Sequence, residues 1–398
     1  MTRHSCVKPI SRLLNLCLLL SGLAASLFAS SLAATALQLE TVGTGPTAKI
    51  GDIRFVPHMI SVQGAAVAAG DVDHDGHPDL ISGGDPLLTI FRGDGQGGLA
   101  PFSHVPGGQN PVDFALADLN EDGNIDLVVA NHDTDYLTLL LGDGQGFFQP
   151  AANSPLRISV RPHPHAVRAA DLDTDGHVDL IVDHREAEGL LILRGLGNGQ
   201  FATPGILVAA GGDPYRGMAV GDLNNDGKPD IVTPNPREVG ILRNTSDTHL
   251  AFSPATFVAA NAPFAVALGD FNGDGNLDLL AASDEGSSLV ELFWGDGRGS
   301  FEEATGSPVR FASGGKKIAV GDFNTDGMAD AVVSSYFASE VLVILGRPSS
   351  ILVGSLPVGE HPWSLTVADL NGDARDDIVV GDDTIHQAWI YLSLTQKD

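Results

Sequence analysis

The sequence predicts an all-β protein, a seven-bladed β-propeller with four antiparallel strands in each blade. One observation is an aspartate-rich loop of nine residues that recurs seven times at intervals of 47 to 53 residues, which is typical of propeller blades. Another is a pattern of strands and turns that repeats with each loop. The composition agrees, because 48 Gly, 23 Pro and 43% hydrophobic residues indicate a packed, turn-rich chain. The loops begin at Asp71, Asp118, Asp171, Asp222, Asp270, Asp322 and Asp369.

Each repeat supplies the strands of one blade. An apolar segment of small residues, such as 265–269, precedes the loop, and a β-branched run, such as 127–129, follows it. A third strand, such as 137–141, ends in a glycine-rich turn, where glycine provides the positive φ of a tight reversal. A less regular fourth strand, such as 206–209, completes the repeat. Four short strands in about 50 residues predict a propeller blade.

The two ends of the repeat array predict a closed ring. After the seventh loop only two strand-like segments remain, 377–380 and 389–392. Residues 54–62, which precede the first blade, resemble the last strand of a blade. We expect this N-terminal strand to complete the seventh blade, so that residues 37–398 form a single propeller.

Residues 1–36 resemble an export signal. Arg3, Lys8 and Arg12 precede an uncharged apolar stretch, and Ala34-Thr35-Ala36 has the form of a cleavage site. The alternative is an uncleaved anchor, because the stretch is long enough to cross a bilayer. We expect a secreted, periplasmic or cell-surface protein and a monomer.

The charge of the chain bears on its partners. Fifty acidic residues against 22 basic ones give a formal net charge of -28. Such a surface repels nucleic acid and anionic membranes, so we expect neither as a partner. The excess of carboxylates instead indicates bound metal cations.

The recurring loops have the ligands that calcium prefers. In the first loop, the carboxylates of Asp71, Asp73, Asp75 and Asp79 and the carbonyl of His77 can converge on one ion. Calcium accepts about six to eight oxygen ligands, whereas zinc prefers His and Cys. The alternative for a single loop is an ordinary Asp/Asn/Gly turn, but seven copies in phase favour up to seven calcium ions, one in each blade. The corresponding ligands are Asp118, Asn120, Asp122, Asn124 and Asp126; Asp171, Asp173, Asp175, His177 and Asp179; Asp222, Asn224, Asp226, Lys228 and Asp230; Asp270, Asn272, Asp274, Asn276 and Asp278; Asp322, Asn324, Asp326, Met328 and Asp330; and Asp369, Asn371, Asp373, Arg375 and Asp377.

The loops and the glycine-rich turns together resemble the FG-GAP and VCBS repeats of integrin-like propellers. The resemblance covers about residues 50–398 and implies that the calcium loops lie on one face of a ring, between the first and second strands of each blade. The seventh loop departs from the pattern, because Ala374 replaces the glycine of the other loops. We expect the weakest calcium site there, since a positive φ is unfavourable for a residue with a Cβ atom.

Two classes of function remain open. One is a binding or adhesion module for a carbohydrate or protein ligand, and the other is a polysaccharide lyase or hydrolase on a propeller scaffold. The sequence contains no G-x-S-x-G or H-E-x-x-H motif, no Walker loop and no candidate catalytic thiol, which favours the binding module. A candidate ligand site lies six residues before the loops, where the side chains vary from blade to blade. The alternative, which we favour at this point, is that these are loop residues with no shared role. The candidate ligand residues are His165, Arg216, Phe264, Lys316 and Trp363.

Overall fold

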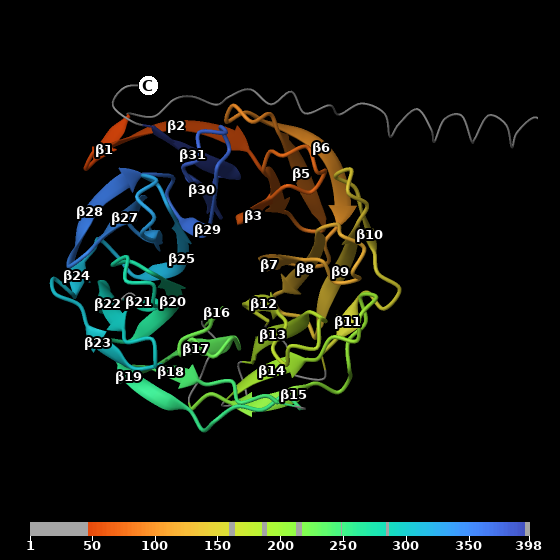
Figure 1. The fold of residues 1–398 in the computed structure, drawn as a ribbon. Coiled ribbons are helices and arrows are strands. Elements are labelled where there is room, and N and C mark those ends of the chain that lie inside the picture. The colour runs from red at the N-terminus through yellow and green to blue at the C-terminus, as the bar shows by residue number, and fades with distance from the viewer. Residues whose placement is uncertain are drawn as a thin grey trace, which may run out of the picture. The chain divides into compact units, whose positions relative to one another are not determined.

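In the computed structural model, seven antiparallel sheets are arranged in a ring around a central axis (Figure 1). The structure describes residues 47–158, 164–184, 189–211, 217–247, 249–283 and 286–394. All regular elements in these ranges are strands. The described residues contain no helix with the length and apolar character needed to span a membrane. The predicted fold class is therefore confirmed, whereas the predicted export signal lies outside the described residues.

Each blade is one sheet, and the strand that precedes its aspartate loop lies nearest the axis (Figure 1). Blades 1 to 3 consist of β3 (Ala66–Gly70), β4 (Asp79–Gly83), β5 (Leu87–Gly93) and β6 (Leu99–Pro106); β7 (Pro111–Ala117), β8 (Asp126–Asn131), β9 (Tyr136–Gly142), β10 (Phe148–Pro150) and β11 (Leu156–Arg157); and β12 (Val167–Ala170), β13 (Asp179–His184), β14 (Gly189–Leu193) and β15 (Ile206–Ala209). Blades 4 and 5 consist of β16 (Ala219–Gly221), β17 (Asp230–Asn235), β18 (Glu238–Leu242) and β19 (Thr256–Ala259); and β20 (Pro263–Gly269), β21 (Asp278–Ser283), β22 (Leu289–Gly295), β23 (Phe301–Glu303) and β24 (Val309–Arg310). Blades 6 and 7 consist of β25 (Gly315–Gly321), β26 (Asp330–Ser335), β27 (Glu340–Arg347) and β28 (Ser350–Pro357); and β29 (Pro362–Ala368), β30 (Asp377–Asp382), β31 (Gln387–Leu394), β2 (Ile53–Ser61) and β1 (Ala48–Ile50). In blades 2 and 5 the fourth strand is split in two, because β10 and β11 both pair with β9, and β23 and β24 both pair with β22.

The ring is closed by the N-terminal strand. β2 pairs with β31 in an antiparallel register that runs from Arg54 opposite Leu394 to Ser61 opposite Gln387. This confirms the prediction for residues 54–62. The fifth strand β1, which forms a hairpin with β2, was not predicted.

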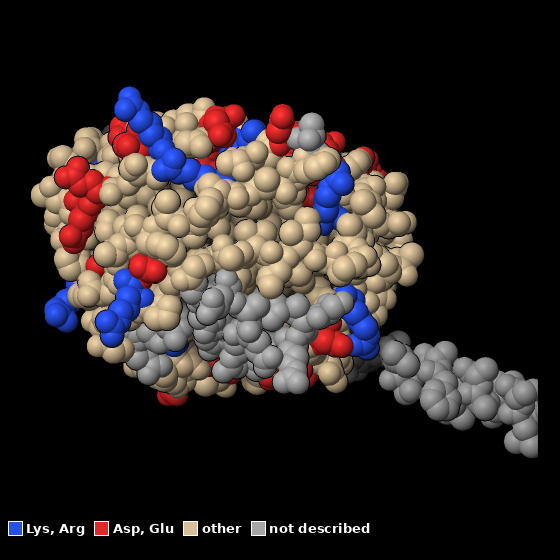
Figure 2. Space-filling model, turned by 90° about the horizontal axis from the view of Figure 1, so that it is seen from below, with Lys and Arg blue, Asp and Glu red and all other residues tan. Residues whose placement is uncertain are grey.

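The hydrophobic core lies between adjacent blades. One cluster joins Val128 and Leu139 of blade 2 to Leu180 and Leu191 of blade 3, and equivalent clusters lie between other neighbours. The second strand of a blade, such as β8, is buried along its whole length because both of its faces pack against sheets. Seen from the side, the visible surface is mostly uncharged in the middle, and charged side chains lie mainly toward the rims (Figure 2).

A partly buried ion cluster crosses the ring near the axis. The Nζ atom of Lys317 on β25 lies 2.9 Å from Oδ1 of Asp113 on β7, although blades 7 and 1 separate these strands. Nη1 of Arg168 on β12 lies 2.8 Å from the other oxygen of the same carboxylate. Burial opposes ionisation, but the two cations outweigh it and hold the pKa of Asp113 below its usual value. Three blades are thereby joined through one carboxylate.

Candidate functional site

The aspartate loops join the first strand of each blade to the second, and all of them therefore lie at the same end of the innermost strands. Backbone N–H groups orient the ligand side chains within each loop. In the second loop, Gly123 N donates to Oδ2 of Asp118 at 2.8 Å, and Asp122 N donates to Oδ1 of Asn120 at 3.0 Å. Asn124 N donates to Oδ1 of Asp122 at 2.9 Å. The alternate side chains at positions 1, 3 and 5 are thus tied to the loop's own backbone.

The ninth residue of each loop has a structural role that the sequence did not reveal. Asp79 is 1% exposed, and its two oxygens accept hydrogen bonds from Val72 N in the loop and from Gly93 N at the end of the third strand. The same pair of bonds recurs at Asp126, Asp179, Asp230, Asp278, Asp330 and Asp377. Each carboxylate oxygen keeps a second lone pair, so this role does not prevent it from binding a metal.

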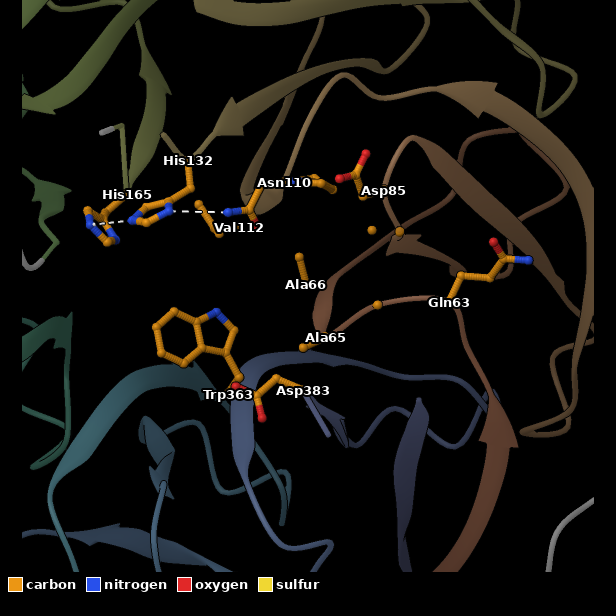
Figure 3. Close-up of a pocket in the computed structure, with 14 residues that line it drawn as sticks. Gln63, Ala65, Ala66, Asp85, Asn110, Val112, His132, His165, Trp363 and Asp383 are labelled. Atoms are coloured by element: carbon orange, nitrogen blue, oxygen red, sulfur yellow. Dashed lines mark hydrogen bonds between the residues drawn. The ribbon is translucent and has the colours of Figure 1, made fainter. Parts of the chain in front are cut away.

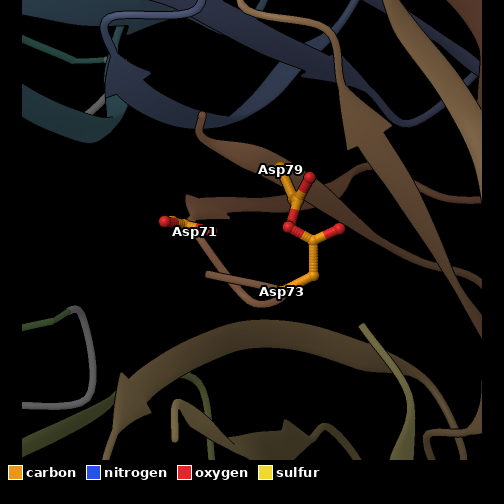
Figure 4. A group of neighbouring side chains, drawn as sticks. All are labelled: Asp71, Asp73 and Asp79. Carbon is orange, nitrogen blue, oxygen red and sulfur yellow. The ribbon is translucent and has the colours of Figure 1, made fainter. Parts of the chain in front are cut away.

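In each of two loops, three carboxylates lie close enough together to hold one cation. Asp71, Asp73 and Asp79 each offer an oxygen within 4.8 Å of the others (Figure 4), and so do Asp171, Asp173 and Asp179. Oδ1 of Asp71 and Oδ1 of Asp173 are buried and accept no hydrogen bond. A buried oxygen without a partner is unfavourable, and a cation satisfies it, so these residues fit calcium.

Two arginines also contact these carboxylates, which sequence reasoning missed. Nε of Arg92 lies 2.5 Å from Oδ2 of Asp73. Arg194 contacts Asp173 through Nε at 2.8 Å and Asp175 through Nη2 at 2.7 Å. Arg92 comes directly before Gly93, the last residue of β5, and Arg194 directly follows Leu193, the last residue of β14. This position at the end of the third strand was the available signal, because that end of the strand adjoins the loop.

Burial raises the pKa of the ninth aspartate, and the charges of the other loop carboxylates raise it further. The pKa is raised to about 6 at Asp79, Asp126, Asp179 and Asp278. It is raised to about 7 at Asp330 and Asp377. These loops therefore favour protons or metal cations over uncompensated negative charge.

The backbone of the loops confirms the strain expected at Ala374, whose φ is 69°. The glycines at the same position have φ between 79° and 90° in the other six loops. A second position with positive φ, the fourth of each loop, was not predicted. It is occupied by His74, Glu121, Thr174, Asn225 and Thr325 in five loops and by glycine in two.

A pocket of about 330 Å³ lies at the opposite end of the innermost strands (Figure 3). Trp363 and His165, two of the five candidate ligand residues, line it together with Ala65 and Val112 from the same position in other blades. Several further lining residues were missed because they lie in the turns after the second strands or directly before an innermost strand. These are His132, Asn110, Asp85 and Asp383.

Two histidines from neighbouring blades meet at one side of the pocket (Figure 3). Nε2 of His132 lies 3.0 Å from Nε2 of His165, and Nδ1 of His132 lies 3.0 Å from Oδ2 of Asp133. Asp183 accepts hydrogen bonds at 2.8 Å from the backbone N–H of His165 and of Ala166, which fixes this segment. Burial raises the pKa of Asp183 well above its usual value.

Neither of the other described candidate ligand residues, Phe264 and Lys316, lines the pocket. Nζ of Lys316 is 4.2 Å from the ring centroid of Phe264 and 5.8 Å from that of Tyr336. The ring of Tyr336 is in turn 5.6 Å from Trp363. A series of contacts therefore runs from Phe264 through Lys316 and Tyr336 to Trp363. Arg216 lies outside the described residues.

The fold and the loops define a seven-bladed propeller whose blades each present one aspartate-rich loop at the same end of the ring. A model of the FG-GAP-like repeat matches residues 71–129, 118–182, 185–233, 230–281 and 270–333, well over half of the chain. The chain belongs to this family. The match ends before the seventh loop, which contains Ala374.

The fold is also similar to that of a solved lectin. The BP39L lectin from Burkholderia pseudomallei superimposes with a TM-score of 0.60 at 14% sequence identity. The match covers 82% of this chain and 96% of the lectin. At this identity the similarity concerns the fold alone.

Proposed function

We propose that this protein is an exported calcium-binding propeller that acts as a carbohydrate-binding module, with its ligand in the pocket lined by Trp363, His165 and His132. The observation that carries the proposal is the pocket itself, which brings together side chains from blades 1, 2, 3 and 7. The indole of Trp363 offers an apolar surface for the C–H face of a sugar ring. Asn110, Asp85 and the histidines offer hydrogen bonds for its hydroxyl groups.

Two further considerations support a carbohydrate over other ligands. The solved propeller with a similar fold is a lectin, which supports the proposal as an analogy of scaffold only. The pocket is also at the small end of the range of ligand sites, about 300 to 1,000 Å³, which suits one or two sugar rings better than a folded protein partner.

Calcium has a structural role in this proposal. When bound, each ion would offset two of the negative charges of the loop carboxylates and join the start of the loop to its end, as in the set Asp71, Asp73 and Asp79. The ninth aspartate already links the loop to the third strand by hydrogen bonds. The loops would therefore stabilise the blades, and the pocket at the other end would recognise the ligand.

A second candidate function is a polysaccharide lyase or hydrolase. It is favoured by the contact between His132 and His165, since an imidazole pair oriented by Asp133 can accept and release protons. The pocket would then hold the polymer next to these two rings. The two candidates make different predictions about product formation.

The decisive experiment measures binding on a glycan array and product formation from neutral and acidic polysaccharides. Trp363→Ala is expected to lose glycan binding, and the control Phe147→Ala is expected to retain it, because Phe147 lies in the turn between β9 and β10 at the loop end of blade 2. If wild type forms product and His165→Asn binds polymer without forming it, the protein is an enzyme. If no glycan binds to wild type, the carbohydrate proposal is wrong.

A further inference from the structure

An aromatic cluster lies beside the pocket on blades 6 and 7. Tyr336 and Phe337 occupy the turn between β26 and β27, and His361 immediately precedes β29. The ring centroid of Tyr336 is 4.6 Å from that of Phe337 and 4.9 Å from that of His361. We call these three residues the aromatic shelf. Phe337 is 53% exposed, although phenylalanine is normally buried.

The aromatic shelf contacts two residues of the pocket wall through Tyr336. The hydroxyl of Tyr336 donates a hydrogen bond of 2.7 Å to Oδ2 of Asp383, and the ring of Tyr336 contacts Trp363 edge to face. Trp363 and Asp383 both line the pocket and lie on the side opposite Asn110 (Figure 3). A ligand that leaves the pocket past Trp363 therefore meets the aromatic shelf.

The exposure of Phe337 is not needed to build the blade. The equivalent turn contains Gly84 and Asp85 in blade 1 and Asp383 and Thr384 in blade 7, so the scaffold accepts small or polar residues there. Turns at one end of a rigid scaffold commonly carry binding residues, and exposed apolar groups next to a pocket mark contact surfaces. An exposed ring at this turn is therefore better explained by a ligand than by packing.

We propose that the aromatic shelf is a second subsite, on which the following units of a neutral oligosaccharide stack after the first units have entered the pocket. This inference rests on the proposed carbohydrate-binding function. The pocket of about 330 Å³ has room for only one or two sugar rings, so a longer chain must continue along a neighbouring surface. Aromatic rings contact the apolar faces of sugars, and His361 and the Tyr336 hydroxyl can bond to their hydroxyl groups.

The charge of the protein selects a neutral chain over an acidic one. Asp85 and Asp383 line the pocket, and the whole chain has a formal charge of -28. The ammonium of Lys316 lies over the rings of Phe264 and Tyr336, and Lys317 is paired with Asp113. A polyanionic glycan would meet carboxylates at the pocket and a repulsive field on approach.

The test measures how affinity depends on chain length. Neutral cello-, manno- and malto-oligosaccharides and an acidic series, the oligogalacturonides, from mono- to hexasaccharides, are titrated by calorimetry into the calcium-loaded protein. Wild type is expected to bind a tetrasaccharide at least tenfold more tightly than the monosaccharide of the best series. In Phe337→Ala that ratio should fall by about fivefold, the effect of losing one aromatic contact.

Controls separate the subsite from the fold and from the pocket. Phe147→Ala removes an exposed ring at the other end of the inner strands and should keep the wild-type ratio. Tyr336→Phe keeps the ring but removes the bond to Asp383, and should reduce the ratio less than Phe337→Ala does. Melting curves check that Phe337→Ala is folded.

The possible outcomes distinguish this inference from the proposed function. If monosaccharides bind and longer chains gain nothing, or if Phe337→Ala keeps the full gain, the second subsite is refuted while the pocket stands. If only acidic oligosaccharides gain affinity with length, the neutral ligand class is refuted. If no saccharide of any length binds, the proposed function fails and the subsite with it.

Discussion

The substitution Ala374→Gly tests the physical account of the seventh loop. Ala374 has a φ of 69°, in the left-handed region, where the other six loops have glycine. A Cβ atom added at any of those six glycines meets no atom within 4 Å. The penalty at this position therefore comes from the backbone conformation itself and not from a steric clash with neighbouring residues.

The expected gain follows from two opposing terms. The left-handed conformation costs a residue with a Cβ atom about 1–2 kcal/mol. Glycine loses about 0.5–1 kcal/mol more conformational entropy on folding than alanine does. The net free energy of unfolding should rise by about 0.5–1 kcal/mol. For a propeller of this size, that corresponds to an increase in Tm of about 1 °C.

Urea unfolding in saturating calcium is the more sensitive assay, because it compares transition midpoints at constant temperature. If the wild-type loop relaxes without calcium, it relieves part of the strain at Ala374 and must regain it when calcium binds. Ala374→Gly should then also bind calcium more tightly, by up to about fivefold in Kd. The reciprocal variant Gly123→Ala is the matched control and should lose a similar free energy. If neither Ala374→Gly nor Gly123→Ala changes the free energy of unfolding or the calcium Kd, the positive φ does not reduce the stability or calcium affinity of these loops.

Three other predictions concern calcium binding, the pH dependence of stability, and the ion cluster of Asp113, Arg168 and Lys317. Calcium at a hundredfold excess over Kd should stabilise the protein by about 2.7 kcal/mol for each occupied loop, and an identical Tm in calcium and in chelator would refute the calcium proposal. In chelator, the stability should fall as pH rises from about 4 to 7, because native Asp330 and Asp377, with pKa raised to about 7, hold protons that the unfolded chain has released. The stabilisation by calcium should grow over the same range, and a calcium-free Tm that rises with pH contradicts this account. Lys317→Met should lower the free energy of unfolding by about 3 kcal/mol in urea titrations, since it removes a partner of buried Asp113; a loss below about 1 kcal/mol would show that Arg168 suffices.

The fold was predictable because its signal is repeated. Seven loops in phase fix the number of blades, and residues 54–62 together with the short seventh repeat predicted closure, which β2 and β31 confirm. The split fourth strands and β1 were not predicted, because the outer strands are short and their sequences less regular. The local hydrophobic pattern of the sequence predicts the inner strands far more strongly than the outer ones.

The sites were predictable only in part, for a physical reason. The loop ligands are close in sequence, so their convergence could be expected from spacing alone. The pocket combines His132, His165 and Trp363 from three blades, and the cluster of Asp113, Arg168 and Lys317 spans the ring. Such contacts depend on the curvature and closure of the ring, which no local pattern encodes.

Each innermost strand connects the loop end of the propeller to the pocket end, and this connection explains why the pocket end can vary. The strand β29 (Pro362–Ala368) carries Trp363 at its pocket end and Ala368 directly before the seventh loop. At the loop end, Asp377 accepts hydrogen bonds from Leu370 N and Ser393 N and so ties the loop to the third strand. Backbone bonds of this kind recur in every blade and do not depend on the residues at the other end. The turns around the pocket can therefore carry different residues in different blades, such as Gly84, Asp383 or Phe337, without loss of the fold. For the same reason, Trp363→Ala should retain the full calcium response of wild type.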